Sequence, residues 1–143
     1  MKKMICLLVI ALMIASVAFA AAKKITPEDL AGLKGTWEGM LDFGLMGAQG
    51  GNSPCKLEIL NDAVPVHIIL TISNIPDSVA SQVGISGGTN VFESYDGVIT
   101  SQGTLMWKGS QDTFFEISMG GKKLSGPYWF RTVRGSVSLK KKK

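Results

Sequence analysis

The sequence predicts an all-β fold, an antiparallel up-and-down β-barrel of about eight strands with a short N-terminal helical turn. The first observation is the alternation of residues 35–43, whose inward face would carry Trp37, Gly39, Leu41 and Phe43. The second is that seven further segments also have strand composition. The third is that the connections are too short for crossover helices, so neighbouring strands must be antiparallel. Eight such strands close into a barrel and leave no free edge.

The expected elements begin with a helical turn in which Thr26 is the cap, Pro27 takes the first position and Gly32 ends the turn. Another one or two helical turns could form with Asp77 as the cap. The dipeptide Asp96-Gly97 is also compatible with a hairpin turn, which would divide one strand and raise the strand count. The expected strands cover residues 35–43, 55–59, 65–73, 89–99, 103–108, 113–118, 123–130 and 135–140.

Large apolar side chains on the inward faces could fill the barrel. An eight-stranded barrel is just wide enough to be filled by side chains or to hold one small ligand. Gly39 and Gly126 either leave room for a ligand or mark bends that close the barrel, whereas aromatic residues at strand spacing usually belong to a core. The expected inward-facing residues on the other strands include Val66, Ile68, Leu70, Ile72, Leu105, Trp107, Phe115, Ile117, Leu124, Tyr128, Phe130, Val137 and Leu139.

Residues 1–22 have the pattern of a secretory signal peptide, which leaves residues 23–143 as a single domain. Two lysines precede an apolar run that ends in the cleavage motifs Ala18-Phe19-Ala20 and Ala20-Ala21-Ala22. A transmembrane anchor would need a longer apolar run without this small-residue exit, and the cleavage zone has no cysteine for lipid attachment. We therefore expect a periplasmic or secreted protein with no stable membrane anchor.

The charge distribution argues against a nucleic-acid-binding protein. Removal of the signal peptide leaves 13 basic and 11 acidic residues, and without the tail Lys140–Lys143 only 9 basic residues remain. A nucleic-acid-binding face should be basic and interleaved with aromatic residues, whereas here the basic excess lies in a cleaved segment and a terminal tail. The lysine tail could touch an anionic lipid surface at about 1 kcal/mol per charge, although such runs are more often simply solvated.

The sequence predicts no cofactor, no metal site and no enzyme. His67 is the single histidine and has no cysteine within metal-ligand spacing. The glycine-rich segment 44–54 leads into a strand and lacks the lysine and helix of a phosphate-binding loop. Cys55, the one cysteine left after processing, is expected to be buried in a strand. Because the acidic residues are scattered singly and no nucleophile has a base beside it, no catalytic constellation is indicated.

The motif Gly35-Thr36-Trp37-Glu38-Gly39, after a helical turn and at the start of an eight-stranded meander, resembles the calycin superfamily of lipocalins, avidins and fatty-acid-binding proteins. The resemblance implies structural roles for Gly35 and Trp37 at the barrel base. It also implies a basic residue over the tryptophan from the end of the last strand, where this chain offers Lys140 or Lys141 in place of the usual arginine. The motif is also similar to the opening of nitrobindin-like haem barrels, but these need a late histidine, so haem is not expected.

Strand order indicates where a binding site would lie. If the first strand runs from base to mouth, the connections after odd-numbered strands, including the long segments 44–54 and 74–88, gather at the mouth. Long loops at a barrel mouth are a common place for binding residues. The candidate ligand contacts at this end are Leu45, Met46, Ile75, Tyr128, Arg131 and Arg134.

Two functional classes fit these observations. The first is an exported lipocalin-like protein that takes up a small apolar ligand at the mouth by hydrophobic burial. The second is a filled barrel that binds an exported protein partner, as an envelope interaction module or an inhibitor, through the loops that contain Leu45-Met46 and Ile75-Pro76. The volume of the barrel interior distinguishes the two, because a lumen without room for a ligand favours the second class.

Overall fold

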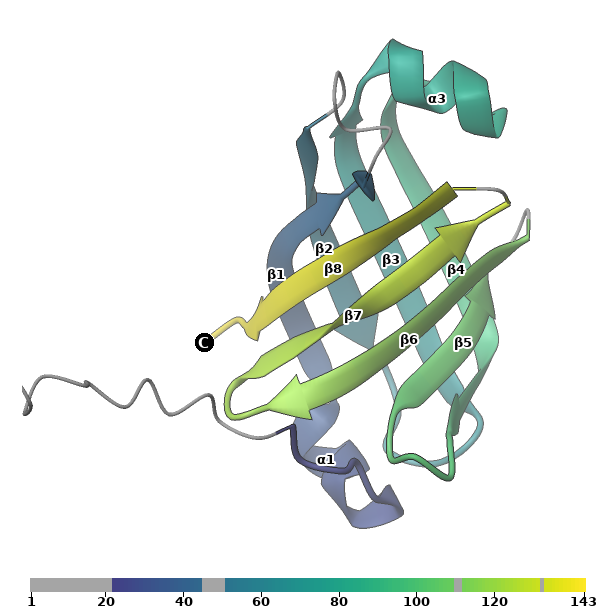
Figure 1. Ribbon diagram of the computed structural model, residues 1–143. Helices are drawn as coiled ribbons and strands as arrows, with labels where there is room; N and C mark the ends of the chain where they lie inside the picture. Colours follow the sequence, from purple (N-terminus) through teal and green to yellow (C-terminus); the bar gives the residue numbers. More distant parts are fainter. Residues whose placement is uncertain (1–21, 45–50, 110–111, 132) are drawn as a thin grey trace, which may run out of the picture.

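The computed structural model describes residues 22–44, 51–109, 112–131 and 133–143, and these residues form a closed eight-stranded antiparallel barrel (Figure 1). Each strand pairs with the next one along the chain, and the last strand pairs with the first. This confirms the predicted fold class and is compatible with a calycin-like fold. The strands are β1 (Gly35–Asp42), β2 (Asn52–Ile59), β3 (Val66–Ile75), β4 (Gly88–Ile99), β5 (Leu105–Gly109), β6 (Thr113–Gly120), β7 (Lys123–Phe130) and β8 (Val133–Lys141).

Helical segments cover the two ends of the barrel (Figure 1). At the base, the 3₁₀ turn η2 (Pro27–Asp29) continues into α1 (Leu30–Leu33), one residue beyond the predicted end at Gly32. At the mouth, α3 (Asp77–Val83) follows β3 and buries Val79, Ala80 and Val83. Asp77 is the first residue of this helix and not its cap, which is Pro76.

Asp96-Gly97 lies within β4 and does not form a hairpin, so the strand count stays at eight in the described residues. The β3–β4 register pairs Val66 with Gly97 but Ile68 with Ser94, which leaves two residues of β4 opposite His67. This is a β-bulge. A Cβ atom at position 97 would lie 2.9 Å from both Cβ and the carbonyl oxygen of Val66, so glycine is required by the close approach of the two strands.

The inward-facing glycines Gly39 and Gly126 mark close strand approaches. A Cβ atom on Gly39 would lie 1.8 Å from the backbone oxygen of Ser138, and one on Gly126 would lie 2.0 Å from that of Glu116. Both distances are far below van der Waals contact. These glycines therefore allow the strands to bend and close the barrel, and they do not leave space for a ligand.

The barrel interior is filled by its own side chains. Phe115 stacks between Trp107 and Tyr128, with ring centroids 5.0 and 5.5 Å apart, and Phe92 meets Phe130 edge to face at 6.0 Å. All the residues predicted to face inward from β3, β5, β6, β7 and β8 are buried, apart from the half-buried Gly126. Cys55 is buried in β2, as predicted, and this burial raises the pKa of its thiol to about 12.

Candidate functional site

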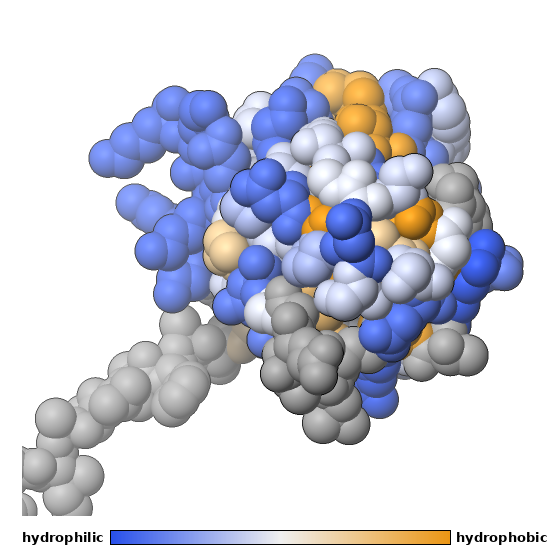
Figure 2. Space-filling view, turned by 90° about the horizontal axis from the view of Figure 1, so that it is seen from above, coloured by the Kyte–Doolittle hydropathy of each residue, from blue (hydrophilic) through white to orange (hydrophobic). Residues whose placement is uncertain are grey.

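At the mouth, where the sequence predicts a ligand site, the described residues pack closely beneath α3. The void beneath α3 measures about 20 Å³ and is lined by apolar and aromatic side chains that include Ile75 and Tyr128. This space is close to the minimum for one water molecule, whereas ligand pockets typically measure 300–1,000 Å³. In the view onto this end, apolar residues appear only in patches between polar ones (Figure 2).

The structure brings some of the candidate ligand contacts together and separates others. Ile75 and Tyr128 are buried beneath α3, and the Tyr128 hydroxyl donates a hydrogen bond to the Asp42 carbonyl at 3.0 Å. Burial raises the pKa of Tyr128, and the nearby carboxylate of Asp42 adds to the shift. Leu45 and Met46 lie outside the described residues.

The two arginines lie near the mouth but do not enter the void. Arg131 has a positive φ of 51°, and its guanidinium lies beside Gly84, where an added Cβ would be 2.7 Å from Nη1. Arg134 lies on the outer wall, with its guanidinium 5.1 Å from the centre of the Trp129 ring. The arginines therefore do not form one site with Tyr128.

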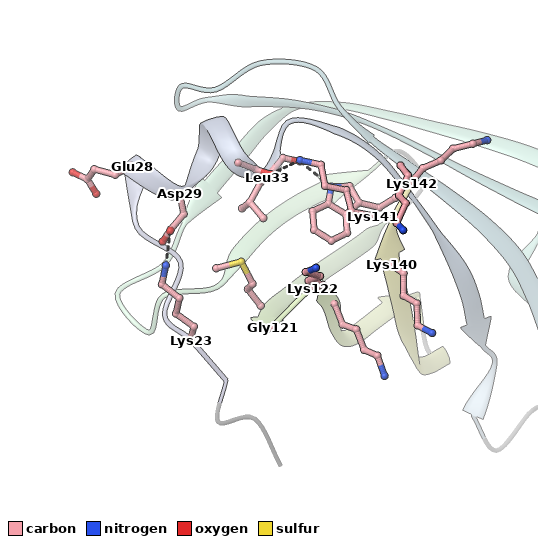
Figure 3. A pocket seen from close by; sticks show the side chains of 14 residues that line it. Lys23, Glu28, Asp29, Leu33, Gly121, Lys122, Lys140, Lys141 and Lys142 are labelled. Atoms are coloured by element: carbon pink, nitrogen blue, oxygen red, sulfur yellow. Dashed lines mark hydrogen bonds and ion pairs between the residues drawn. The ribbon is translucent and has the colours of Figure 1, made fainter. Parts of the chain in front are cut away.

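A larger groove of about 790 Å³ lies at the opposite end, the base of the barrel (Figure 3). Four parts of the chain surround it: the segment before η2, the helical turn, the β6–β7 turn and the end of β8. Its surface is mainly apolar, although its lining contains seven lysines and two acidic residues. The lysines are Lys23, Lys122, Lys123, Lys140, Lys141, Lys142 and Lys143.

Three of these lysines have partners within the protein. Lys23 and Lys142 form ion pairs with Asp29 and Glu38, each at 2.7 Å. The ion pair and the backbone N–H of Thr26 both lower the pKa of Asp29, the ion pair more strongly. Lys141 donates to the backbone carbonyl of Gly32.

The other four lysines, Lys122, Lys123, Lys140 and Lys143, have no carboxylate partner within the described part of the chain. Lys123 and Lys140 lie directly opposite each other in the β7–β8 register. Like charges in this position repel. The groove lining therefore carries an excess of positive charge, with seven lysines against two acidic residues.

The groove floor contains the residues that seal the barrel base. Leu33 and Trp37 are 1% and 3% exposed, and the Trp37 indole Nε1–H donates to the Leu33 carbonyl at 2.8 Å. The cation over the Trp37 ring is Lys141, whose Nζ lies 5.6 Å from the ring centre. Lys140 instead pairs in register with Glu38, one residue away from Trp37.

Gly35 also lies at the base, with a positive φ of 122°. This conformation favours glycine, and an added Cβ would contact the Lys141 side chain at 3.6 Å. Gly35 thus starts β1 directly below the Lys141 side chain that covers Trp37.

This groove is not apparent from the sequence, although the predicted strand order contains a signal for it. The order that assigns Arg131 to the mouth also assigns the β6–β7 turn to the base, beside the C-terminal lysines. Lys122 and Lys123 in that turn are separated from the tail by a whole strand, so no run of charge joins them in the sequence.

His67 belongs to a cluster on the outer wall and not to a metal site. Its ring stacks on Tyr95 at 4.2 Å, and its Nε2 lies 2.7 Å from a carboxylate oxygen of Glu93. The Tyr95 hydroxyl donates to the same oxygen at 2.7 Å. The hydrogen bond from Tyr95 and, to a smaller extent, the one from His67 lower the pKa of Glu93. Among the described residues, no group of acidic, histidine and cysteine side chains could hold a metal ion.

The fold and the site define a filled up-and-down barrel with a cationic groove at its closed base. Comparison of the chain with known protein families, curated proteins and solved structures found no match. None of the helices in the described residues is long and apolar enough to span a membrane. The groove itself is therefore the basis for a functional proposal.

Proposed function

We propose that this protein is an exported, non-enzymatic binding module that acts through its surface and holds a negatively charged partner in the basal groove. The observation that carries the proposal is the facing pair Lys123 and Lys140, with Lys122 and Lys143 in the same groove lining. None of these four lysines forms an ion pair within the described residues. Bringing like charges together costs free energy, and an anion bound between them would recover it.

The closed interior supports a surface role over a ligand in the lumen. A void of about 20 Å³ under α3 has no room for a small apolar molecule, so binding at the mouth would require α3 to move away. The proposal therefore follows the filled-barrel alternative, with the interaction surface at the base and not in the mouth loops.

The export part of the proposal rests on the signal-peptide pattern of residues 1–22. Lys23, which directly follows the second predicted cleavage motif, donates its backbone N–H to the Met119 carbonyl at 2.8 Å and lines the groove. Cleavage before Lys23 would add an α-ammonium group to the lysine set. N-terminal sequencing of protein from its own cells should give a first residue of Ala21 or Lys23, and a retained Met1 would contradict export by this route.

The binding proposal can be tested with inorganic polyphosphate and isothermal titration calorimetry. The groove variant is Lys122→Gln, Lys123→Gln and Lys140→Gln. The matched control, with the same loss of charge, replaces three exposed lysines outside the groove, Lys24→Gln, Lys34→Gln and Lys108→Gln. At about 1 kcal/mol per lysine, the groove variant should bind about 100-fold more weakly, while the control should stay close to wild type.

Two outcomes would contradict the proposal. One is equal weakening in the groove variant and the control, which would mean that polyphosphate senses only the net charge. The other is the absence of measurable binding both to polyphosphate and to the phosphate amphiphile introduced below. Raising the salt concentration should weaken genuine groove binding, because the Debye length falls from about 10 Å at 0.1 M to about 3 Å at 1 M.

A further inference from the structure

We infer that the basal groove takes a single-chain anionic amphiphile, with a phosphate or carboxylate headgroup among the lysines and an alkyl chain along the groove floor. This inference rests on the proposed function and specifies the class of partner. It is carried by the combination of a mainly apolar groove surface with a lysine-rich lining.

The floor of the groove offers apolar contacts that a purely ionic partner does not use. Leu33, Trp37 and Met119 all line it, and of the three the half-buried Met119 at the end of β6 presents the most surface, because Leu33 and Trp37 are almost fully buried. A methionine side chain is flexible and polarizable, so it adapts well to a hydrocarbon chain. Lysine side chains contribute further apolar surface, because their methylene stems lie along the wall while the ammonium groups stay in water.

The lysines are distributed so that the middle of the groove remains unneutralised. In Figure 3, the Lys23–Asp29 ion pair lies at one end of the groove, Lys141 and Lys142 lie at the other, and Lys122 lies between them. A compact anionic headgroup can therefore approach Lys122 and the facing pair Lys123 and Lys140 without displacing either ion pair.

The size of the groove also fits an amphiphile better than a small inorganic ion. Its volume of about 790 Å³ lies within the range of pockets that hold drug-sized molecules. Gly32 and Gly121 line it, and an added Cβ on either residue would meet no atom within 4 Å. Open space beside the apolar floor is what an alkyl chain requires.

Gly32 provides a way to block this space without changing charge. It lies within α1 with no positive φ, so a larger side chain is compatible with its backbone. In Gly32→Leu, the new side chain would extend from the groove lining into open space while all seven lysines remain. Gly32→Ala serves as the matched control, because it changes the same backbone position and occupies little of the space.

The experiment compares dodecyl phosphate, below its critical micelle concentration, with butyl phosphate and inorganic phosphate by calorimetry. Dodecyl phosphate should bind more tightly than butyl phosphate, by about tenfold for every two methylene groups that become buried. Gly32→Leu should weaken dodecyl phosphate binding at least tenfold, with little effect on butyl phosphate, and Gly32→Ala should weaken dodecyl phosphate binding several-fold less than Gly32→Leu.

The outcomes separate this inference from the proposed function. Equal affinity for dodecyl and butyl phosphate, together with lysine-dependent polyphosphate binding, would overturn the amphiphile assignment and leave the proposed function standing. Failure of all these probes to bind would overturn both. The last measurement is adsorption to vesicles of phosphatidylglycerol. If the protein adsorbs to the vesicles, Gly32→Leu does not change that adsorption, and dodecyl phosphate does not bind, the lysines would be assigned to a membrane surface. That result would also overturn the inference.

Discussion

The ammonium group of Lys141 lies 5.6 Å from the centre of the Trp37 ring, across the β1–β8 pair that closes the barrel. The same ammonium group donates to the Gly32 carbonyl at the end of α1. One side chain thus connects the last strand, the first strand and the helical turn. Replacing Lys141 with methionine keeps most of its apolar length but should destabilise the protein by about 1 kcal/mol, because the cation–π contact and the hydrogen bond are lost.

The matched control is Lys140→Met, which should leave the free energy of unfolding almost unchanged, since it removes both the repulsion with Lys123 and the attraction to Glu38, the two residues that lie opposite Lys140 in β7 and β1. Urea unfolding followed by circular dichroism measures both variants. A larger loss from Lys140→Met than from Lys141→Met would contradict this assignment of the two lysines.

Trp37→Ala should cost about 3–5 kcal/mol, as expected for truncation of a large buried aromatic residue. The indole is 3% exposed and also satisfies the Leu33 carbonyl. Trp129→Ala is a useful comparison, because Trp129 is only half-buried on the outer wall and should cost less. A Trp37→Ala protein that melts within two or three degrees of wild type would be inconsistent with a structural role.

Lys123→Glu should stabilise the protein while weakening anion binding. The substitution turns a repulsive cross-strand pair with Lys140 into an attractive one, which is worth roughly 0.2–1 kcal/mol. It also removes a cation from the groove and adds an acid. A rise in melting temperature together with weaker polyphosphate binding would indicate that the repulsion is retained for function. Weakened binding with a lower melting temperature would point to damaged packing.

Gly126→Ala and Gly32→Ala should change stability in opposite directions. A methyl group on Gly126 would lie 2.0 Å from the Glu116 carbonyl oxygen, and the resulting strand displacement should cost about 3 kcal/mol or more. On Gly32 it meets no atom within 4 Å, and alanine favours the helix by up to about 1 kcal/mol. Thermal melting of both variants compares a glycine at a close strand contact with a glycine that has open space around it. Equal changes in melting temperature would contradict the explanation given for Gly126.

Cys55 should be unreactive in the folded protein. Burial raises its pKa from 9.0 to about 12, so almost no thiolate exists at pH 8, and a disulfide reagent should label the thiol fully only after unfolding.

The raised pKa of Cys55 also means that the protonated thiol contributes stability that is complete below about pH 9 and is lost as the pH rises toward 12. Tyr128 adds to the same trend, because its pKa is raised too. A Cys55→Ala variant should therefore lose stability less steeply over this pH range. In the labelling experiment, rapid reaction of the native thiol would argue against the burial of Cys55.

The strands were predictable because alternation with period two leaves a strong signal in segments such as 35–43 and 66–72. The bulge at Gly97 was not, since it depends on how Val66 packs against the neighbouring strand and not on the local sequence. The position of Pro76 as the cap of α3 also depends on tertiary context, because Asp77 has the stronger intrinsic preference for that position.

The groove could not be found in the sequence for a different reason. Lys23, Lys123 and Lys140 come from three separate parts of the chain, and only the β7–β8 register and the path before η2 bring them together. The sequence alone therefore favours a solvated run for the lysine tail. Net charge after processing is close to neutral, so composition gave no sign that one end of the molecule would be strongly basic.

Both Lys23 and Lys143 line the groove, which has a practical consequence for how the protein is prepared. An affinity tag fused before Lys23 or after Lys143 would begin inside or beside the groove, where its bulk would obstruct the groove and any acidic residues in it would compete for the same lysines. A tagged preparation could show no anion binding for this reason alone. Purification should therefore use a cleavable leader whose removal leaves Lys23 as the first residue, with nothing added after Lys143.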